Sequence, residues 1–408
     1  MSYMNKNSLE GQIKSALFFL MIAAFLGTLL RFAFVIEMPV WFKYMNVLHA
    51  HSHGAMMGWL TAAFFALIFW MFNINDPRLI RLFWISQLSV VGMIISFPIQ
   101  GYGPVSIAFS SIFMIVAYII SYRIWKNVKA RDEFNPTTIS FLLTSLFFLA
   151  FSTIGVWSFI PIQIWSYKGS ALYYSMVQFF LHFQFNGWFI FCILALFFRW
   201  MDINKIVYDP RRAKVFFWLL VVSCLMTYAL SVTWSTPLSY IFWINTAGVI
   251  LQLMAAFYLL DILRSVNDEV KKRLSKWQYY LLWISIVCLL LKICIQTFVA
   301  LPYLATISYT IKNFVIGFIH LLMLGCLSTF IFSMAAYSKY KVSKVGVWLF
   351  LLGFLSTEAL LFGQGLMLWG AMGFLPNYHL TLALASALLF IGVFIVFINF
   401  TAIHKKEA

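Results

Sequence analysis

The chain has 408 residues, of which 63% are hydrophobic, 20% are aromatic and only 10% are charged. A soluble globular domain carries about 25% charged residues, so this composition excludes that class and indicates an integral membrane protein. The formal net charge is +16, with 28 Lys and Arg against 12 Asp and Glu. In a membrane protein, positive charge reflects orientation and contact with anionic lipid headgroups, so it does not indicate a nucleic-acid partner.

Twelve apolar stretches are long enough to cross about 30 Å of hydrocarbon as helices that rise about 1.5 Å per residue. In chain order, the predicted helices cover residues 12–36, 46–72, 79–98, 103–124, 137–160, 171–198, 214–234, 239–263, 277–300, 310–337, 345–370 and 378–402. No soluble domain or long linker separates them. We therefore expect an all-α fold in which residues 1–408 form a single polytopic membrane domain, packed as one bundle in the lipid bilayer.

The distribution of Lys and Arg predicts the orientation of the helices. If the N-terminus is inside, 23 of the 28 basic residues fall in cytoplasmic segments, because Lys292 lies within the ninth helix and four residues lie outside. Those four are Arg31, Lys43, Lys168 and Lys312. Since cytoplasmic loops retain Lys and Arg during insertion, we expect both termini on the inner side of the cell's inner (cytoplasmic) membrane.

Five of the seven histidines fall in one layer of the outer half of the membrane, on the second, sixth and tenth helices. The layer consists of His49, His51, His53, His182 and His320. An ionisable side chain inside a bilayer costs several kcal/mol unless it is paired or metal-bound, and histidine is the commonest metal ligand. The layer is therefore a candidate metal site. The alternative is a set of separate hydrogen bonds across helix interfaces. His379 is predicted to be a solvated residue at the outer rim and His404 part of the tail.

Helical geometry limits how many of the second helix's histidines one cofactor can use. Successive residues turn by about 100°, so His49 and His53 share a face while His51 points nearly opposite. A haem between two helices needs one axial imidazole from each side, and one of these histidines paired with His320 would supply them. No Cys-x-x-Cys motif is present, so a covalently attached haem is not expected.

Twelve helices with histidines on the second, sixth and tenth resemble subunit I of the haem-copper oxidase and nitric oxide reductase superfamily. The local patterns are closer to its short members, the NnrS family of nitric-oxide-response membrane proteins and the small oxidase-subunit-I-like proteins. The pattern His-x-His-x-x-x-x-Gly is met by His51, His53 and Gly58, and the tenth-helix pattern begins at His320. The resemblance implies a low-spin haem b held by His53 and His320, with His51 as the rival ligand on the second helix.

In the oxidases, a copper or non-haem iron is held by one histidine of the sixth helix and two of the seventh. Here the sixth helix supplies His182, but the predicted seventh helix, residues 214–234, contains no histidine. This difference argues against a conventional dioxygen-reducing centre. Three roles are open for His182: it shares a second copper or iron with His49 or His51, it lines a ligand pocket beside the haem, or it orients the assembly by hydrogen bonding.

Charged residues in or near the outer half of the membrane have two interpretations each. Arg31, Lys43 and Lys312 are candidate partners for haem propionates, or they are anchors that reach the outer surface. Lys292 and Glu358 lie within helices, and they either pair with each other or line a proton or ion path.

Three functions remain open from the sequence. The leading one is a haem-binding membrane protein in nitric oxide handling or respiratory electron transfer, with quinol or another respiratory membrane protein as partner. If it is an enzyme, it is then a membrane oxidoreductase. The second is a non-redox metal- or haem-binding assembly factor. The third is a proton-coupled secondary transporter, which should show interrupted helices at matching places in its two halves. The prolines that could interrupt helices instead lie near helix ends: Pro98, Pro161, Pro237 and Pro302.

Overall fold

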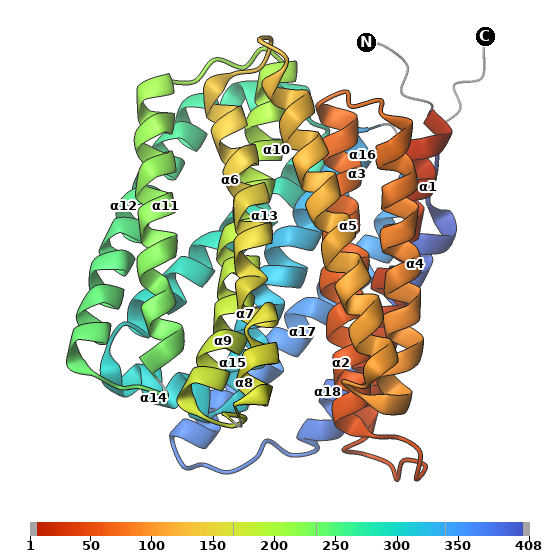
Figure 1. The fold of residues 1–408 in the computed structure, drawn as a ribbon, viewed down its shortest axis with the longest axis vertical. Coiled ribbons are helices and arrows are strands. Elements are labelled where there is room, and N and C mark those ends of the chain that lie inside the picture. The colour runs from red at the N-terminus through yellow and green to blue at the C-terminus, as the bar shows by residue number, and fades with distance from the viewer. Residues whose placement is uncertain (1–5, 166, 234, 339, 403–408) are drawn as a thin grey trace. The chain divides into compact units, whose positions relative to one another are not determined.

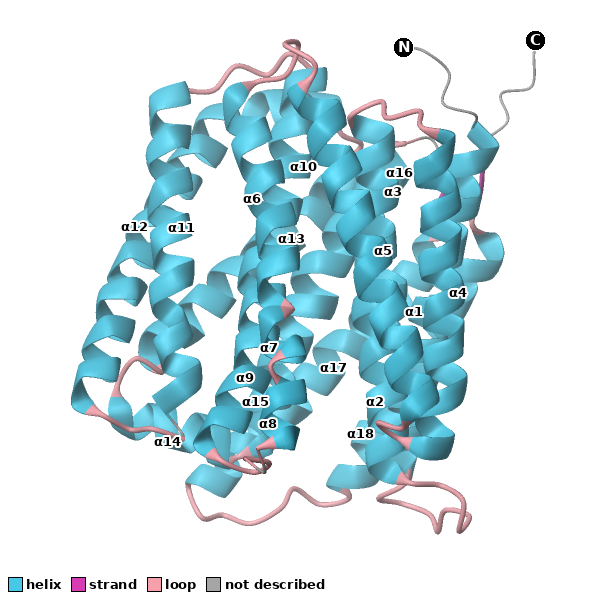
Figure 2. Cartoon of the chain, in the orientation of Figure 1, coloured by secondary structure: helices cyan, strands magenta, loops and turns pink. Residues whose placement is uncertain are grey.

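The computed structural model describes residues 6–165, 167–233, 235–338 and 340–402, and most of them are helical (Figure 2). Twelve helical spans within these residues are long and apolar enough to cross a membrane, which confirms the predicted number. The chain is therefore a multi-pass membrane protein of the all-α class. His404 lies outside the described residues.

One predicted boundary is wrong by ten residues. The eighth span was expected to end at residue 263, but its helix α12 (Ser239–Arg273) continues to Arg273. The extension is polar, and it stays helical because its side chains can pair along the helix. Lys272 Nζ donates to Glu269 Oε1 at 2.7 Å, three residues back. Such pairs on an exposed helix face are weakly stabilising.

The described residues group into two compact units, the first up to Asn127 and again from Ser328 onward, the second from Val128 to Leu327. In Figure 1 the first unit is red, orange and blue, and the second runs from yellow through green to cyan. The single-domain prediction stays a prediction.

The first unit contains eight α-helices, one π-helix and a two-stranded sheet within the described residues. They are α1 (Lys6–Phe32), α2 (Tyr44–His53), η1 (Gly54–Thr61), α3 (Ala62–Met71), α4 (Pro77–Gln100), α5 (Pro104–Lys129), α16 (Thr329–Tyr337), β1 (Tyr340–Lys341), α17 (Lys344–Trp369), α18 (Tyr378–Asn399) and β2 (Thr401–Ala402). The helix α1 packs on α2, η1, α3 and α18, and β1 pairs with β2 in antiparallel fashion.

Local sequence signals define the helix starts and closest packing in the first unit. Asp76 precedes α4, its side chain accepts from Arg78 N, and Pro77 occupies the first turn. A helix tolerates proline there because that N–H has no intrahelical partner. The helices α17 and α18 approach so closely that a Cβ on Gly353 would lie 2.6 Å from Leu389 N. Only glycine permits that approach.

The second unit contains helices and no strand among its described residues. Its elements are α6 (Pro136–Ser152), α7 (Ile154–Trp157), α8 (Phe159–Ile164), α9 (Ala171–His182), η2 (Phe183–Phe189), α10 (Ile190–Ile203), α11 (Pro210–Thr233), α12, α13 (Lys276–Phe298), α14 (Pro302–Thr310), α15 (Lys312–His320) and η3 (Leu321–Ser328). The fifth span is a chain of short helices, and the helices α11 and α12 lie side by side (Figure 1).

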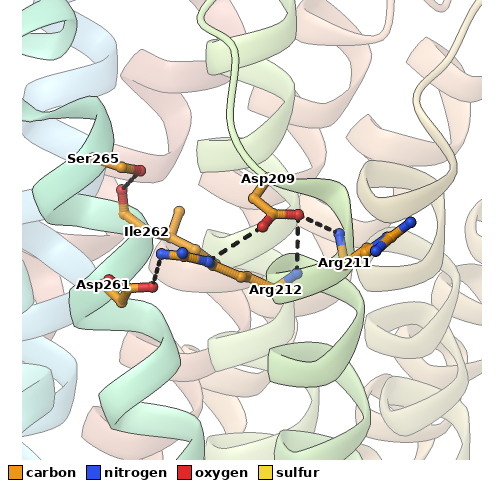
Figure 3. A network of polar contacts seen from close by, with 6 residues as sticks. All are labelled: Asp209, Arg211, Arg212, Asp261, Ile262 and Ser265. Carbon is orange, nitrogen blue, oxygen red and sulfur yellow. Dashed lines mark hydrogen bonds and ion pairs between the residues drawn. The ribbon is translucent and has the colours of Figure 1, made fainter.

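Arg212, in the first turn of α11, is joined to Asp261 of α12 by an exposed polar network (Figure 3). Its Nε lies 3.2 Å from Asp209 Oδ2, and its Nη1 pairs with Asp261. Asp209 also accepts from the backbone N–H of Arg211, at 2.8 Å. The partners are 35–48% exposed, so solvent weakens each pair to at most about 1 kcal/mol.

The three spans that carry the histidine layer are the most buried of the twelve. In their most apolar windows, 89% of the residues of Tyr44–Met71, 83% of Ala171–Ile203 and 61% of Lys312–Tyr337 are buried. The other nine spans range from 33% to 50%. Most side chains in these apolar windows therefore pack against protein, as functional groups inside membranes do.

Candidate functional site

His49 and His53 lie on one face of α2 and contact the same two aromatic side chains. The His53 ring centroid is 4.4 Å from that of Phe97 and 6.2 Å from that of Tyr102. For His49 the corresponding distances are 5.9 Å and 4.6 Å. These contacts confirm the shared face that the helical period predicts.

His51 points away from that face and packs on α1. Its Nδ1 lies 2.8 Å from the carbonyl oxygen of Ala23. A Cβ on Gly27 would lie 2.9 Å from His51 Cε1, so the missing side chain at Gly27 leaves the space for the ring. His51 therefore holds the interface between α1 and α2.

Hydrogen bonds to backbone carbonyls define which ring nitrogen of His51 and His53 carries a hydrogen. His53 Nδ1 lies 2.8 Å from the carbonyl oxygen of His49, one turn earlier. A carbonyl oxygen only accepts, so Nδ1 carries the hydrogen in both rings. Each Nε2 then presents a lone pair, the form in which imidazole binds a metal. His53 and His51 thus both have the chemistry of an axial haem ligand.

Each of the three most buried spans changes from α-helix to π-helix directly after a histidine. The last α-helical residues are His53, His182 and His320, and the π-helices η1, η2 and η3 begin at the next residue. π-Helical turns are rare and are frequently found at functional sites, because the wider turn redirects side chains. The positions of these three histidines are therefore equivalent within their own spans.

A glycine follows each of these histidines by five residues, a spacing that the sequence pattern noted only for His53 and Gly58. The three glycines are Gly58, Gly187 and Gly325. A Cβ on Gly58 would lie 2.6 Å from the side chain of Phe19, and one on Gly187 would lie 2.5 Å from Phe148. Two of the π-helices therefore accept an aromatic ring directly against the backbone. The repeated His-x-x-x-x-Gly spacing could have revealed the three-part pattern.

His182 differs from the second-span histidines because both of its ring nitrogens are engaged. Nε2 lies 2.8 Å from the carbonyl oxygen of Cys224 on α11, and Nδ1 lies 3.3 Å from Asn186 Nδ2. Asn186 Oδ1 in turn accepts from Lys292 Nζ at 2.5 Å. Hydrogen bonding, one of the roles expected for His182, is therefore what the structure shows for its ring. Asn186, which sequence reasoning missed, connects it to Lys292.

No group of three or more His, Cys, Asp and Glu side chains suited to hold a metal occurs among the described residues. The second-span histidines belong to the first unit, and His182 and His320 belong to the second. The axial pair His53 and His320, and a metal shared by His182 with His49 or His51, stay predictions.

The other predicted site residues take distinct positions. Arg31, at the end of α1, interacts electrostatically with Glu358, Tyr378 and Tyr44. Lys43 is exposed and immediately precedes α2. Arg31 therefore has a counter-charge within its own unit, whereas Lys43 faces outward from the helix that carries His53.

The intramembrane charges Lys292 and Glu358 each have a partner within their own unit. Lys292 bonds to Asn186, and Glu358 interacts with Arg31. Asn186 is neutral, so it gives Lys292 a hydrogen-bond acceptor without a counter-charge, whereas Arg31 is a counter-charge for Glu358. His379 is exposed, as expected, and its ring stacks on Phe34 with centroids 5.3 Å apart.

No family model and no curated protein matches this sequence. Among solved structures, the chain is similar to one described as "Cryo-EM structure of a heme-copper terminal oxidase dimer provides insights into its catalytic mechanism". The TM-score is 0.70 at 14% sequence identity, over 100% of this chain and 86% of that one. The chain therefore has the fold of a haem-copper terminal oxidase, as the histidine pattern led us to expect.

Proposed function

We propose that this protein binds a b-type haem and acts in respiratory electron transfer or nitric oxide handling, as a member of the short NnrS-type group. The observation that carries the proposal is the placement of His53 and His320. Each lies at the α-to-π transition of a strongly buried span, in a chain whose whole length has the haem-copper oxidase fold. A bound haem would supply one-electron redox chemistry.

The described residues of the second span fit an axial ligand. The bond from His53 Nδ1 to the carbonyl of His49 fixes the ring and directs Nε2 away from its own helix. His51 has the same tautomer, but its ring is held against α1 by Ala23 and Gly27. We therefore prefer His53 and retain His51 as the rival. Phe97 packs beside His53 and limits the access of water to it.

Arg31 and Lys43 are the proposed partners of the haem propionates. Lys43 is the stronger candidate, since it is exposed and its charge has no ion pair among the described residues. Arg31 shares its charge with Glu358. The proposed setting is the cytoplasmic membrane with both termini inside, and a quinol or another respiratory membrane protein is the proposed electron donor.

The protein is not proposed to reduce dioxygen to water. The seventh span contains no histidine, and the ring nitrogens of His182 are already used by Cys224 and Asn186. Purified protein should therefore show no cyanide-sensitive consumption of dioxygen with a quinol donor. Robust activity of that kind would overturn this part of the proposal.

Absorption spectra of the purified protein, oxidised and dithionite-reduced, test the haem proposal. The native chain should show the sharp reduced bands of a six-coordinate b-type haem. His53→Ala and His320→Ala should each remove an axial bond, and so give a five-coordinate spectrum or lose the haem. His379→Ala is the matched control and should leave the spectrum unchanged. His51→Ala distinguishes the rival ligand, and full haem content in His320→Ala would overturn the axial assignment.

A further inference from the structure

Lys292 is a fully buried basic residue in the second unit, and it pairs with no acidic side chain among the described residues. Its side chain is 0% exposed, and it lies about 24 Å along α13 from Lys276. None of the ion pairs between described residues includes Lys292. The acidic residues of the second unit all lie near the helix ends predicted to be cytoplasmic: Asp132, Glu133, Asp202, Asp209, Asp261, Asp268 and Glu269. The described residues of the second unit therefore supply no carboxylate as a counter-charge for Lys292.

The hydrogen bonds around His182 fix Lys292 as a donor. The carbonyl oxygen of Cys224 only accepts, so His182 Nε2 carries the hydrogen and Nδ1 of the neutral ring accepts. Asn186 must then direct its NH₂ group to Nδ1, and the same group also donates to the backbone carbonyl of His182 at 3.2 Å. Asn186 Oδ1 consequently faces Lys292 and accepts from it.

This arrangement uses one of the three hydrogens of the Lys292 ammonium group. The described surroundings offer neutral groups for the others rather than a carboxylate. Gln296 lies one turn further along α13, is 5% exposed, and its Oε1 has no hydrogen-bond partner. The thiols of Cys224 and Cys326 are within electrostatic range of Lys292. A buried ammonium group surrounded only by dipoles is strongly disfavoured, so it either gives up its proton or is accompanied by a counter-ion.

We propose that Lys292 and Asn186 form the core of a binding site for one small monovalent inorganic anion in the interior of the second unit. Lys292 supplies the compensating charge and the free N–H groups. Asn186 and His182 hold the ammonium group in place. Each donates to a backbone carbonyl oxygen, which can only accept, so the direction of these hydrogen bonds is fixed. This site is independent of the proposed haem ligands His53 and His320.

Chloride is the probe for this site. The full-length protein, purified with its native cofactors in a halide-free gluconate solution, is titrated with sodium chloride at constant ionic strength. Binding is followed by the line width of the chloride NMR signal. We expect one chloride per native chain, and loss of that binding in Lys292→Met. Lys312→Met, which removes an exposed lysine on α15, is the matched control and should bind chloride as the native chain does.

A second variant tests the same inference while keeping the lysine. Gln296→Glu places a carboxylate four residues after Lys292 on the same helix, where the two side chains can pair. This internal counter-ion should displace chloride and abolish the broadening. Absence of chloride binding in the native chain, or unchanged binding in both Lys292→Met and Gln296→Glu, would overturn the proposal. A chloride-dependent change in the haem spectrum that parallels the broadening would also overturn it, by placing the anion at the iron.

Discussion

Replacing Ser328 with alanine removes the acceptor of a buried hydrogen bond in the first unit. Trp59 Nε1 donates to Ser328 Oγ at 2.9 Å, and the two residues are 2% and 0% exposed. An indole has a single donor, so Ser328→Ala leaves that N–H without an acceptor where water cannot reach it. An unsatisfied buried donor costs about 1–3 kcal/mol, and we expect the free energy of unfolding to fall by about 2 kcal/mol.

The double-mutant cycle isolates this hydrogen bond from other effects of the substitutions. Trp59→Phe removes the donor but also leaves a small cavity, so its own cost includes lost packing. Once the indole N–H is gone, Ser328→Ala should cost much less. The coupling between the two sites should therefore be about 1–2 kcal/mol. A value near zero would show that the bond does not hold these segments together.

Equilibrium unfolding in mixed micelles, followed by circular dichroism, measures these differences. Ser338→Ala is the matched control, because Ser338, the residue after α16, donates its Oγ hydrogen to the nearby carbonyl of Ala335. Its cost should stay below about 0.5 kcal/mol, as for most changes away from the core. If Ser328→Ala is no more destabilising than Ser338→Ala, the reasoning is refuted. Since Trp59 lies six residues after His53, we also expect weaker haem retention in Ser328→Ala.

Three further predictions concern other contacts. Gly27→Ala places a Cβ 2.9 Å from His51 Cε1 and should destabilise the protein by about 1–3 kcal/mol in the same unfolding assay. Burial raises the pKa of Tyr340 to about 12. An unfolded tyrosine ionises near pH 10, so the free energy of unfolding should keep its full contribution from Tyr340 below pH 10 and fall by about 1 kcal/mol at pH 11. Tyr340→Phe should remove this loss. Arg212→Met breaks the exposed pair with Asp261 and should cost less than about 1 kcal/mol.

Each of these predictions has a control or a contrary outcome. Gly363→Ala adds a methyl group where no atom lies within 4 Å, so it should not destabilise α17. An equal loss in Gly27→Ala and Gly363→Ala would contradict the steric argument. The alkaline prediction is wrong if Tyr340→Phe and the native chain lose stability equally between pH 9 and 11. The small effect of Arg212→Met should shrink further at high salt, since exposed pairs are screened.

Sequence reasoning located the spans and the face of each second-span histidine, because both depend on local periodicity. An apolar run of about 20 residues must become a membrane-crossing helix, since its backbone polar groups have no other partner in lipid. The shared face of His49 and His53 follows from the helical turn alone. The end of α12 was missed because the polar segment 264–273 stays helical beyond the membrane, and hydropathy does not measure that.

The chemical state of the histidines depended on contacts between residues far apart in the chain. His182 and His53 are both histidines, yet only His182 has both ring nitrogens in hydrogen-bond contact, with Cys224 and Asn186. Cys224 lies 42 residues later, and Asn186 is itself bonded to Lys292, 106 residues further on. Asn186 lies one helical turn after His182, but no local pattern specifies Cys224 or Lys292, because helix packing brings these residues to the site. The sequence by itself therefore determined which spans carry the polar groups. The tertiary structure alone decided which nitrogens remain available and which charge is left without a partner, because desolvation and hydrogen bonding act only after the helices have packed.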